Sequence, residues 1–257
     1  MSAWLPFETH PLYAGAVLAI AVFGALTFPL LFWITAPYGR HFREGWGPTL
    51  PARLGWVLME APSPLGFALV FLVTPGARSP AAWLLFALFQ LHYVYRTFVF
   101  PFRMRGEGKR KPLLTVAMAF LFNCANGPVN AFAIVTFGAH LQGLGDARLL
   151  AGACVFLAGW ALNQHADHVL LTLRAPGESD YKIPDRGLHR LVASPNYLGE
   201  MLEWGGFALA AATAPAVVFF LFTVANLAPR ARANLRWYRD RFADYPPTRR
   251  ALVPFVW

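Results

Sequence analysis

Seven apolar stretches, each close to the length that crosses a lipid bilayer, dominate this sequence and limit the folds that it can adopt. A helix needs about 20 apolar residues to cross the hydrocarbon layer. Because backbone polar groups find no water there, only helices and closed barrels can cross it. The stretches lie near 12–34, 54–74, 81–100, 113–138, 149–173, 196–212 and 214–228. They predict an all-α integral membrane protein, a seven-transmembrane helix bundle.

The composition agrees with a membrane location. Apolar residues make up 57% of the 257 residues and charged residues only 14%, against roughly 25% charged residues in ordinary soluble domains. The sequence shows no internal repeat, low-complexity tract or separate soluble domain. Residues 1–257 are therefore predicted to form a single transmembrane domain.

Positive charge decides between six and seven crossings. The last two stretches are separated only by the sequence ATAP, so they could form one long kinked segment. With seven crossings, the segments 36–53, 101–112, 174–194 and 229–257 share one side and carry 19 of the 22 Lys and Arg. Basic loops stay in the cytoplasm, so the N-terminus is predicted outside and the C-terminus in the cytoplasm. Charges spread over separate loops that flank a membrane make nucleic acid a poor partner.

Polar side chains inside predicted membrane helices are rare and mark functional sites. Two of the stretches carry three such residues each, within about 40° and about 60° of one another on a helical wheel. These residues are Asn163, Asp167 and Arg174 in the fifth stretch, and Asn196, Glu200 and Glu203 in the sixth. Glu60 and Tyr93 add a carboxyl and a phenol in the second and third. We therefore expect a water-accessible cavity open to the cytoplasm, and not only hydrogen bonds that join helices.

A metal centre is not expected. His165 and His168 are three residues apart, but no further His or carboxylate pattern completes a set of ligands. The chain also lacks the complete GxGxxG and Walker A motifs of soluble nucleotide-binding folds. A nucleotide cofactor would have to be held by the helical bundle itself.

Several sequence blocks resemble one known family. They are LPARLGWVLMEAPS, APYGRHF, LHYVYRTFVF, NQHADHVLLTLRAPGESDYKIPDRGLHRLVASPNYLGEMLEWGGFALA and RWYRDRFADYPPTRRALVPFVW. In this order they closely resemble the steroid 5α-reductases, also called 3-oxo-5α-steroid 4-dehydrogenases, over nearly the whole chain. The combination LRxPGE, NYLGE, EW and DYPxxRxALxPF is highly specific for that family.

The resemblance implies a seven-helix enzyme that binds NADPH from the cytoplasmic side. Such an enzyme transfers hydride to C5 of a 3-oxo-Δ4 steroid, and a proton arrives at C4. The implied cofactor-binding residues are Tyr38, Asn163, Asp167, Arg174, Tyr181, Asn196, Glu200, Arg230 and Tyr238. Glu203 shares a helical face with Asn196 and Glu200, and it is expected to line the nicotinamide end with them. We also predict an integral, multi-pass protein of a bacterial inner membrane or of the endoplasmic reticulum, acting as a monomer.

Hydride transfer to an enone builds negative charge on the carbonyl oxygen, so a hydrogen-bond donor placed there lowers the barrier. Tyr93 can donate through its hydroxyl, and Glu60 can donate when it is protonated. The resemblance places both residues, as catalytic and substrate-binding groups, at the 3-keto oxygen. Arg96 lies one turn from Tyr93, where it could orient that residue or pair with a carboxylate, and it is the third substrate-binding candidate.

The sequence departs from the family pattern at two places, and three alternative functions stay open. Asn234 stands where the family has a histidine, and the basic loop 101–112 is longer than in close relatives. The alternatives are a related sterol or polyprenol double-bond reductase, a membrane methyltransferase that uses S-adenosylmethionine, and a sterol-binding protein without catalysis. Neither of the last two explains a carboxyl and a phenol at membrane depth.

Overall fold

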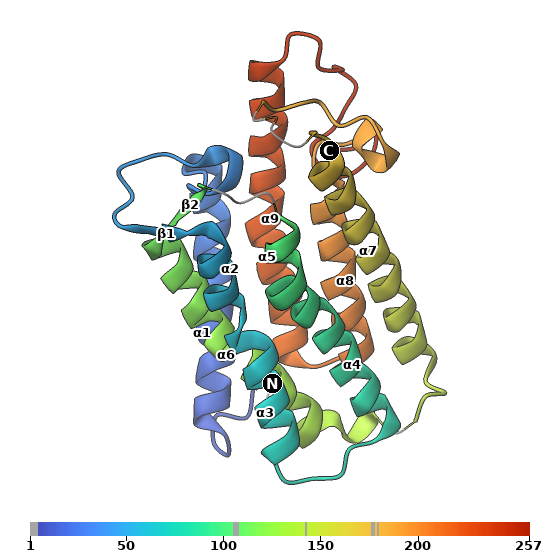
Figure 1. The fold of residues 1–257 in the computed structure, drawn as a ribbon. Coiled ribbons are helices and arrows are strands. Elements are labelled where there is room, and N and C mark those ends of the chain that lie inside the picture. Colours follow the sequence, from blue (N-terminus) through green and yellow to red (C-terminus); the bar gives the residue numbers. More distant parts are fainter. Residues whose placement is uncertain (1–4, 105–107, 142, 176–177, 179) are drawn as a thin grey trace.

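The structure is a computed structural model that describes residues 5–104, 108–141, 143–175, 178 and 180–257. Long helices run side by side and form an elongated bundle (Figure 1). The helices are α1 (Pro11–Trp33), α2 (Ala52–Glu60), α3 (Pro62–Val73), α4 (Pro80–Val94), α5 (Phe100–Arg103), α6 (Leu113–Phe137), α7 (Ala147–Thr172), α8 (Pro195–Ala211) and α9 (Ala214–Arg241). A π-helical segment, Tyr95–Val99, joins α4 to α5, and 3₁₀ turns occur at Gly39–His41, Gly138–His140 and Gly187–Arg190.

All seven predicted stretches are helical. Within the described residues, five segments are long and apolar enough to cross a membrane. They are Pro11–Trp33, Ala52–Val73, Leu113–His140, Ala147–Thr172 and Ala214–Arg241. The other two helices are shorter, since α4 has 15 residues and α8 has 17. The helical membrane fold is thus confirmed, whereas seven crossings and their orientation stay a prediction.

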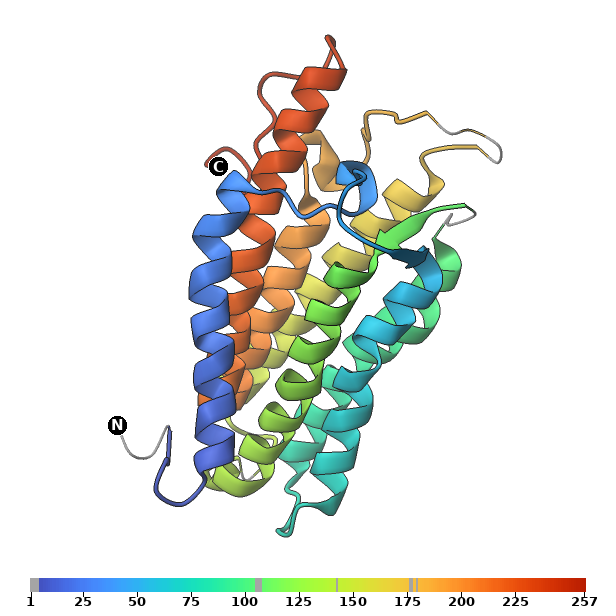
Figure 2. The ribbon, with the colours of Figure 1, turned by 90° about the vertical axis from the view of Figure 1, so that its left-hand side faces the viewer.

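The chain runs from one end of the bundle to the other. α1 begins near one end, and the C-terminus lies near the opposite end (Figure 2). α1 packs along the side of the bundle, where Val17 and Ile20 belong to an apolar cluster with Val129 and Ala133 of α6. The two ends of the described chain thus lie toward opposite ends of the bundle.

Four glycines bring α7 and α8 into direct backbone contact. Gly152 of α7 faces Gly206 of α8, and Gly159 of α7 faces Gly199 of α8. The two glycines within each helix are seven residues apart. A Cβ atom added at Gly159 would stand 2.5 Å from the backbone nitrogen of Glu203. Small residues at helix crossings allow such close approach within a membrane. This contact holds the two predicted polar faces, one on each helix, at the same depth.

Proline interrupts the second stretch beside Glu60, as the sequence indicates. α2 ends at Glu60 and α3 begins at Pro62, while Ala61 between them keeps helical backbone angles (φ −54°, ψ −36°). Pro64 cannot donate the hydrogen bond that a helix would send to the carbonyl oxygen of Glu60. Glu60 therefore lies at a weakened point of the helix, with its side chain half-buried.

The all-α prediction missed a short antiparallel ribbon. β1 (Thr49–Pro51) pairs with β2 (Arg110–Pro112), with Leu50 opposite Lys111. The ribbon lies at the end of the bundle where the C-terminal tail also lies (Figure 1). Three-residue strands show no alternating pattern, and their partners here are about 60 residues apart, so the sequence does not reveal them. Residues 105–107 of the basic loop lie outside the described residues.

The last helix is longer than its apolar stretch. The stretch ends near 228, but α9 continues through Pro229 to Arg241. Arg230, Asn234 and Tyr238 follow one another at intervals of four residues, and all three are buried. The extension thus presents one face to the connecting loops. Its buried contacts explain why a polar sequence remains helical here.

Candidate active site

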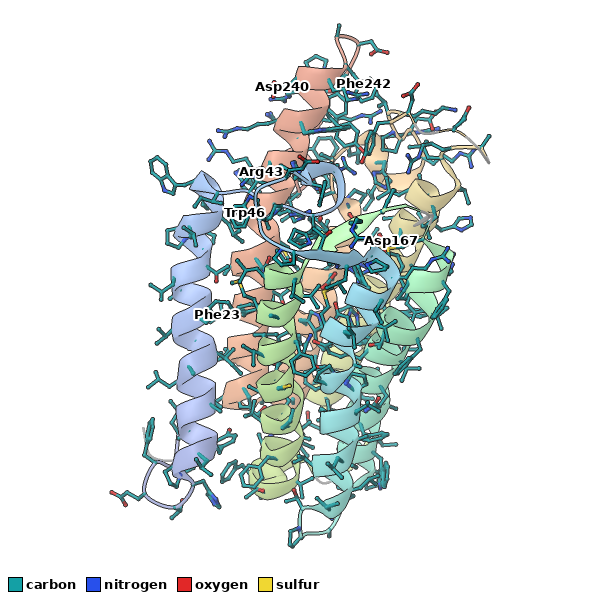
Figure 3. The ribbon with its side chains drawn as sticks, turned by 60° about the vertical axis from the view of Figure 1, so that its left-hand side comes forward. Phe23, Arg43, Trp46, Asp167, Asp240 and Phe242 are labelled. Atoms are coloured by element: carbon teal, nitrogen blue, oxygen red, sulfur yellow. The ribbon has the colours of Figure 1, made fainter. Side chains whose placement is uncertain are left out.

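The two predicted polar faces meet at one half-buried guanidinium, that of Arg96. Nη1 of Arg96 lies 3.2 Å from Oδ2 of Asp167, and Nη2 lies 3.7 Å from Oε2 of Glu200. Nδ2 of Asn196 donates to Oδ1 of Asp167 over 2.9 Å, and Nδ2 of Asn163 donates to the carbonyl oxygen of Asn196 over 2.9 Å. These five residues form the ion-pair layer. Figure 3 shows Asp167 in the same half of the bundle as Arg43 and Trp46.

The π-helical segment positions Arg96. π-Helical turns are rare and often mark functional sites, because they turn a side chain out of the regular helical order. The carbonyl oxygen of Arg96 accepts a hydrogen bond from the Trp56 indole over 3.0 Å. Its guanidinium lies 4.8 Å from the Trp56 ring and 4.6 Å from the Phe100 ring. Arg96 is thus fixed from α2, α5, α7 and α8.

Glu203 does not join the ion-pair layer, although it shares a helical face with Asn196 and Glu200. It is fully buried, and its Oε2 lies 2.5 Å from Nδ1 of His92 on α4. Sequence reasoning missed His92. Its position directly before Tyr93, inside an apolar stretch, was the available signal. The contact between Glu203 and His92 instead joins α8 to the turn that carries Tyr93.

Three asparagines of α6 lie beside the two predicted catalytic residues. Asn126 donates through Nδ2 to the Tyr93 hydroxyl oxygen over 3.4 Å, and Asn123 donates to Oε2 of Glu60 over 3.4 Å. Asn130 donates to Oδ1 of Asn126 over 3.2 Å, which directs the Asn126 amide nitrogen toward Tyr93. All three asparagines are buried. We call these five residues the amide layer.

The Tyr93 ring is held by aromatic neighbours. Its centroid lies 4.7 Å from that of Phe89 and 5.5 Å from that of Trp204. Trp204 also packs against Phe219, at 4.4 Å. Tyr93 is only 4% exposed, so its ring has a defined orientation and its hydroxyl end reaches Asn126 of α6.

Two further predicted cofactor residues, Tyr38 and Arg230, contact each other at the end of the bundle. The Arg230 guanidinium stacks 3.6 Å from the Tyr38 ring centroid and donates to the Tyr38 carbonyl oxygen over 3.0 Å. Arg230 also donates to the Tyr197 hydroxyl over 3.0 Å. Burial raises the pKa of the Tyr38 hydroxyl. The segment before the first 3₁₀ turn is thereby fastened to α9.

Asn234, the departure from the family pattern, makes two side-chain hydrogen bonds. Its Nδ2 donates to Oγ of Ser194 over 3.0 Å, and its Oδ1 lies 2.9 Å from Nε2 of His41. Burial lowers the pKa of His41 to about 4, so the ring is neutral near pH 7 and donates to Asn234. Asn234 therefore links the start of α8 to the first 3₁₀ turn.

The remaining predicted residues lie farther out. Arg174 follows the end of α7, and its guanidinium lies 5.3 Å from the Tyr181 ring. Tyr238 is buried on α9, stacked 5.1 Å from Tyr245 and 4.6 Å from the Arg40 guanidinium. These residues surround the loop end of the bundle, whereas the ion-pair layer lies inside it. A surface hollow of about 230 Å³ between α1 and α9 contains none of the predicted site residues.

Comparison with known proteins places the chain in a family. The family described as 3-oxo-5-alpha-steroid 4-dehydrogenase matches residues 109–257. The 3-oxo-5-alpha-steroid 4-dehydrogenase 1 of Bos taurus is 39% identical over 241 residues, 91% of this chain and 92% of the relative. The chain belongs to the 3-oxo-5-alpha-steroid 4-dehydrogenase family.

Two other members of this family match almost end to end. Steroid 5-alpha-reductase DET2 of Gossypium hirsutum is 38% identical over 255 residues, 96% of this chain and 98% of the relative. The 3-oxo-5-alpha-steroid 4-dehydrogenase 1 of Homo sapiens is 37% identical over 253 residues, 97% of this chain and 96% of the relative. The predicted resemblance is confirmed. The family name describes an oxidoreductase that acts on a CH–CH bond of a steroid.

A family of steroid reductases implies a nicotinamide cofactor, and the buried polar atoms of this chain fit one. Nη1 of Arg40 and Nε of Arg249 are buried donors without a partner among the described residues. The phosphates and hydroxyls of a dinucleotide are acceptors of the kind that such donors require. Among the same residues, no group of three His, Cys, Asp or Glu is placed to hold a metal ion.

Proposed function

We propose that this protein reduces the Δ4 double bond of 3-oxo-Δ4 steroids to 5α-dihydrosteroids, with NADPH as the reductant. The observation that carries the proposal is the amide layer. In it a carboxyl, Glu60, and a phenol, Tyr93, each accept a hydrogen bond from an amide of α6. Two potential acids at bundle depth, beside an ion-pair layer open to polar ligands, suit an enone reductase better than a binding protein.

Tyr93 would stabilise the developing enolate. Its oxygen already accepts from Nδ2 of Asn126, so its own hydrogen is left to donate to the steroid 3-keto oxygen. That oxygen gains negative charge as C5 is reduced, and a donor already in place stabilises the transition state more than the ground state. Asn130 acts through Asn126 by fixing the orientation of its amide.

Glu60 would donate to the same oxygen in its protonated form. Nδ2 of Asn123 donates to Oε2 of Glu60 and also, over 2.7 Å, to the carbonyl oxygen of Met59. The amide therefore fixes one carboxyl oxygen and leaves the other for the steroid. Two donors on one carbonyl oxygen form an arrangement of the oxyanion-hole type.

The cofactor would lie on the loop side of the steroid. When bound, the reduced nicotinamide supplies the hydride to C5. Asn163, Asp167, Asn196 and Glu200 would bind its carboxamide and ribose, since amides and carboxylates suit these groups. Tyr38, Arg174, Tyr181, Arg230 and Tyr238 would surround the rest. Arg96, which the sequence analysis assigns to the substrate, is better explained as the residue that pairs with both Asp167 and Glu200.

Glu203 would act indirectly, and not as a cofactor ligand. Its carboxyl holds the imidazole of His92, the residue before Tyr93. A group that supports its neighbour in this way restricts the position of the turn that carries Tyr93. Substitution of Glu203 should therefore affect turnover more than NADPH affinity.

We propose one transmembrane domain with seven crossings, an outside N-terminus and a cytoplasmic C-terminus. The segments that contain most of the Lys and Arg lie between those crossings on one side, as basic loops in the cytoplasm do. The protein would be a monomer in a bacterial inner membrane or in the endoplasmic reticulum, depending on its source. A reporter fused after Trp257 should give a cytoplasmic signal, and an outside signal would contradict seven crossings.

The test is reduction of a Δ4-3-ketosteroid, such as progesterone or testosterone, by the purified protein in detergent or liposomes. With NADPH we expect the 5α-dihydrosteroid, identified by its stereochemistry, and far slower turnover with NADH. Methyl transfer from S-adenosylmethionine would support the methyltransferase alternative. Reduction of a sterol side chain or a polyprenol, but of no ketosteroid, would overturn the proposed substrate.

A further inference from the structure

Lys111 is a buried cation that the sequence analysis did not assign. It lies in β2 opposite Leu50, and only 5% of its surface is exposed. Its Nζ lies 4.1 Å from the Trp56 ring and 5.4 Å from the Tyr38 ring. Its hydrogen bond goes to Sδ of Met59, over 3.4 Å, and a thioether is a weak acceptor.

The charge balance around Lys111 differs from that around Arg96. Arg96 has two carboxylates within ion-pair distance. Among the ion pairs of the described residues, none involves Lys111 or Arg230. Both of these cations lie against the Tyr38 ring, Arg230 at 3.6 Å and Lys111 at 5.4 Å. Two buried cations without a carboxylate therefore converge on one tyrosine.

Such an arrangement is costly without an anion. A buried charge is stable only when a partner replaces the hydration that it lost. Burial lowers the pKa of Lys111 to about 7; Glu60 opposes this effect, whereas Arg96 and Arg230 add to it. In the absence of a ligand, Lys111 is thus partly neutral at physiological pH. An anion beside it would restore the positive charge.

We propose that Lys111 is a binding residue for the diphosphate of the cofactor, which it holds together with Arg230 at the Tyr38 ring. This inference rests on the proposed function. Lys111 contacts Met59 and Trp56, which lie next to Glu60 and within one turn of it, so it is close to the reacting end of the cavity. Of the phosphates in NADPH, the diphosphate is nearer to the nicotinamide than the 2′-phosphate is. The location therefore selects the diphosphate.

The experiment measures the dissociation constants of NADPH and NADH for the full-length protein in detergent, by tryptophan fluorescence. Lys111→Met should weaken both cofactors by about tenfold to a hundredfold, the usual effect of losing a charge-assisted contact. Lys111→Arg keeps the cation and should remain within a few-fold of wild type. Arg110→Met is the matched control, because it removes the exposed cation next to Lys111 in the same strand, whose side chain contacts Thr49, and should change neither constant.

The pH dependence gives a second readout. Since an anion favours the charged form of Lys111, binding above pH 7 requires proton uptake. Between pH 6.5 and 8.5 the wild-type affinity for NADH should fall, approaching tenfold per pH unit. The fall should vanish in Lys111→Arg, whose side chain stays charged. This comparison remains decisive if Lys111→Met fails to fold.

Three results would overturn the inference while leaving the proposed function intact. Unchanged affinity of Lys111→Met for both cofactors would show that the ammonium contacts no phosphate. A loss confined to NADPH would assign Lys111 to the 2′-phosphate. An equal pH dependence in wild type and Lys111→Arg would exclude titration of Lys111 on binding. If the wild-type protein bound neither cofactor, the proposed function itself would fail.

Discussion

The ion-pair layer and the amide layer lie in the same bundle, but the contacts that hold their polar groups differ. In the ion-pair layer, one guanidinium is shared by two carboxylates at 3.2 and 3.7 Å. In the amide layer, Glu60 and Tyr93 each receive one neutral donor at 3.4 Å. The first layer holds formal charges in place. The second leaves its acidic hydrogens available.

The difference matters for an enone reduction. Ion pairs and hydrogen bonds already hold the groups of the first layer, so under the proposed function this layer contacts a polar cofactor without being reorganised. In the second layer Glu60 and Tyr93 accept from the asparagines, so under the proposed function their own hydrogens donate to a carbonyl oxygen as it gains charge. Preorganised donors that strengthen during the reaction are the effective ones. The comparison predicts that the two layers respond differently to substitution.

The largest expected effect separates turnover from cofactor binding. Tyr93→Phe keeps the packed ring and removes the hydroxyl, so turnover should fall by about 10²–10³, or roughly 3–4 kcal/mol. NADPH affinity should stay near that of wild type, because the hydroxyl belongs to the amide layer. Both quantities are measured by steroid reduction and by cofactor titration.

The companion variants at Glu60 test the same separation. Glu60→Gln keeps a donor and should lose less turnover than Glu60→Ala, which keeps none. Wild-type turnover in Tyr93→Phe would mean that another group stabilises the enolate. A collapse of NADPH affinity would instead show that the two layers are assigned to the wrong ligands.

The second effect concerns the backbone contact that brings the ion-pair layer together. Gly159→Leu would force a side chain against the Glu203 backbone, and the resulting overpacking should lower stability by about 1–3 kcal/mol or more. The measurement is thermal unfolding in detergent. Gly205→Ala is the control, because its Cβ would approach only the Phe220 ring, at 3.2 Å. Equal melting temperatures for wild type and Gly159→Leu would contradict the close crossing.

A smaller effect tests how α6 orients the Tyr93 hydroxyl. Asn126→Ala removes the hydrogen bond to the Tyr93 hydroxyl and the one accepted from Asn130. Loss of the bond to Tyr93 should lower turnover by about fivefold to tenfold, in keeping with roughly 1 kcal/mol. In a Tyr93→Phe background the same change should have little further effect, because its target is gone. A double-mutant cycle measures this coupling. Fully additive losses would show that Asn126 supports only the fold.

The smallest effect is a pH dependence of the loop end. Because burial lowers the pKa of His41 to about 4, the folded state favours the neutral ring. The unfolded value is near ~6.5, so this contribution is complete above that pH and is lost as pH falls toward 4. Melting temperatures from pH 7.5 to 4.5 should therefore fall less steeply in His41→Gln. An identical slope would mean that His41 does not titrate on unfolding.

Much of the fold and part of the site could be predicted from the sequence. Helices follow from the apolar stretches, and helical spacing predicted two polar faces of three residues each. Four of these six residues, Asn163, Asp167, Asn196 and Glu200, meet in the structure, whereas Arg174 and Glu203 have other partners. The partner of Glu203 and the burial of Lys111 could not be predicted from the sequence. Glu203 shares the same helical face, but a crossing helix presents His92 to it. Lys111 looked like one of several loop cations until the ribbon placed it inside the bundle.

By itself, the sequence determined the helical class, the family and the presence of acids and amides within the membrane stretches. Chain-local properties decide these features: hydrophobic length, helical period and a distinctive order of motifs. Only the tertiary structure decided which side chains became partners. Arg96 pairs with Asp167 and Glu200, and Asn126 reaches Tyr93, because glycine contacts and a π-helical turn set the depth and rotation of neighbouring helices. Those contacts join residues far apart in the chain, where spacing within one helix carries no information.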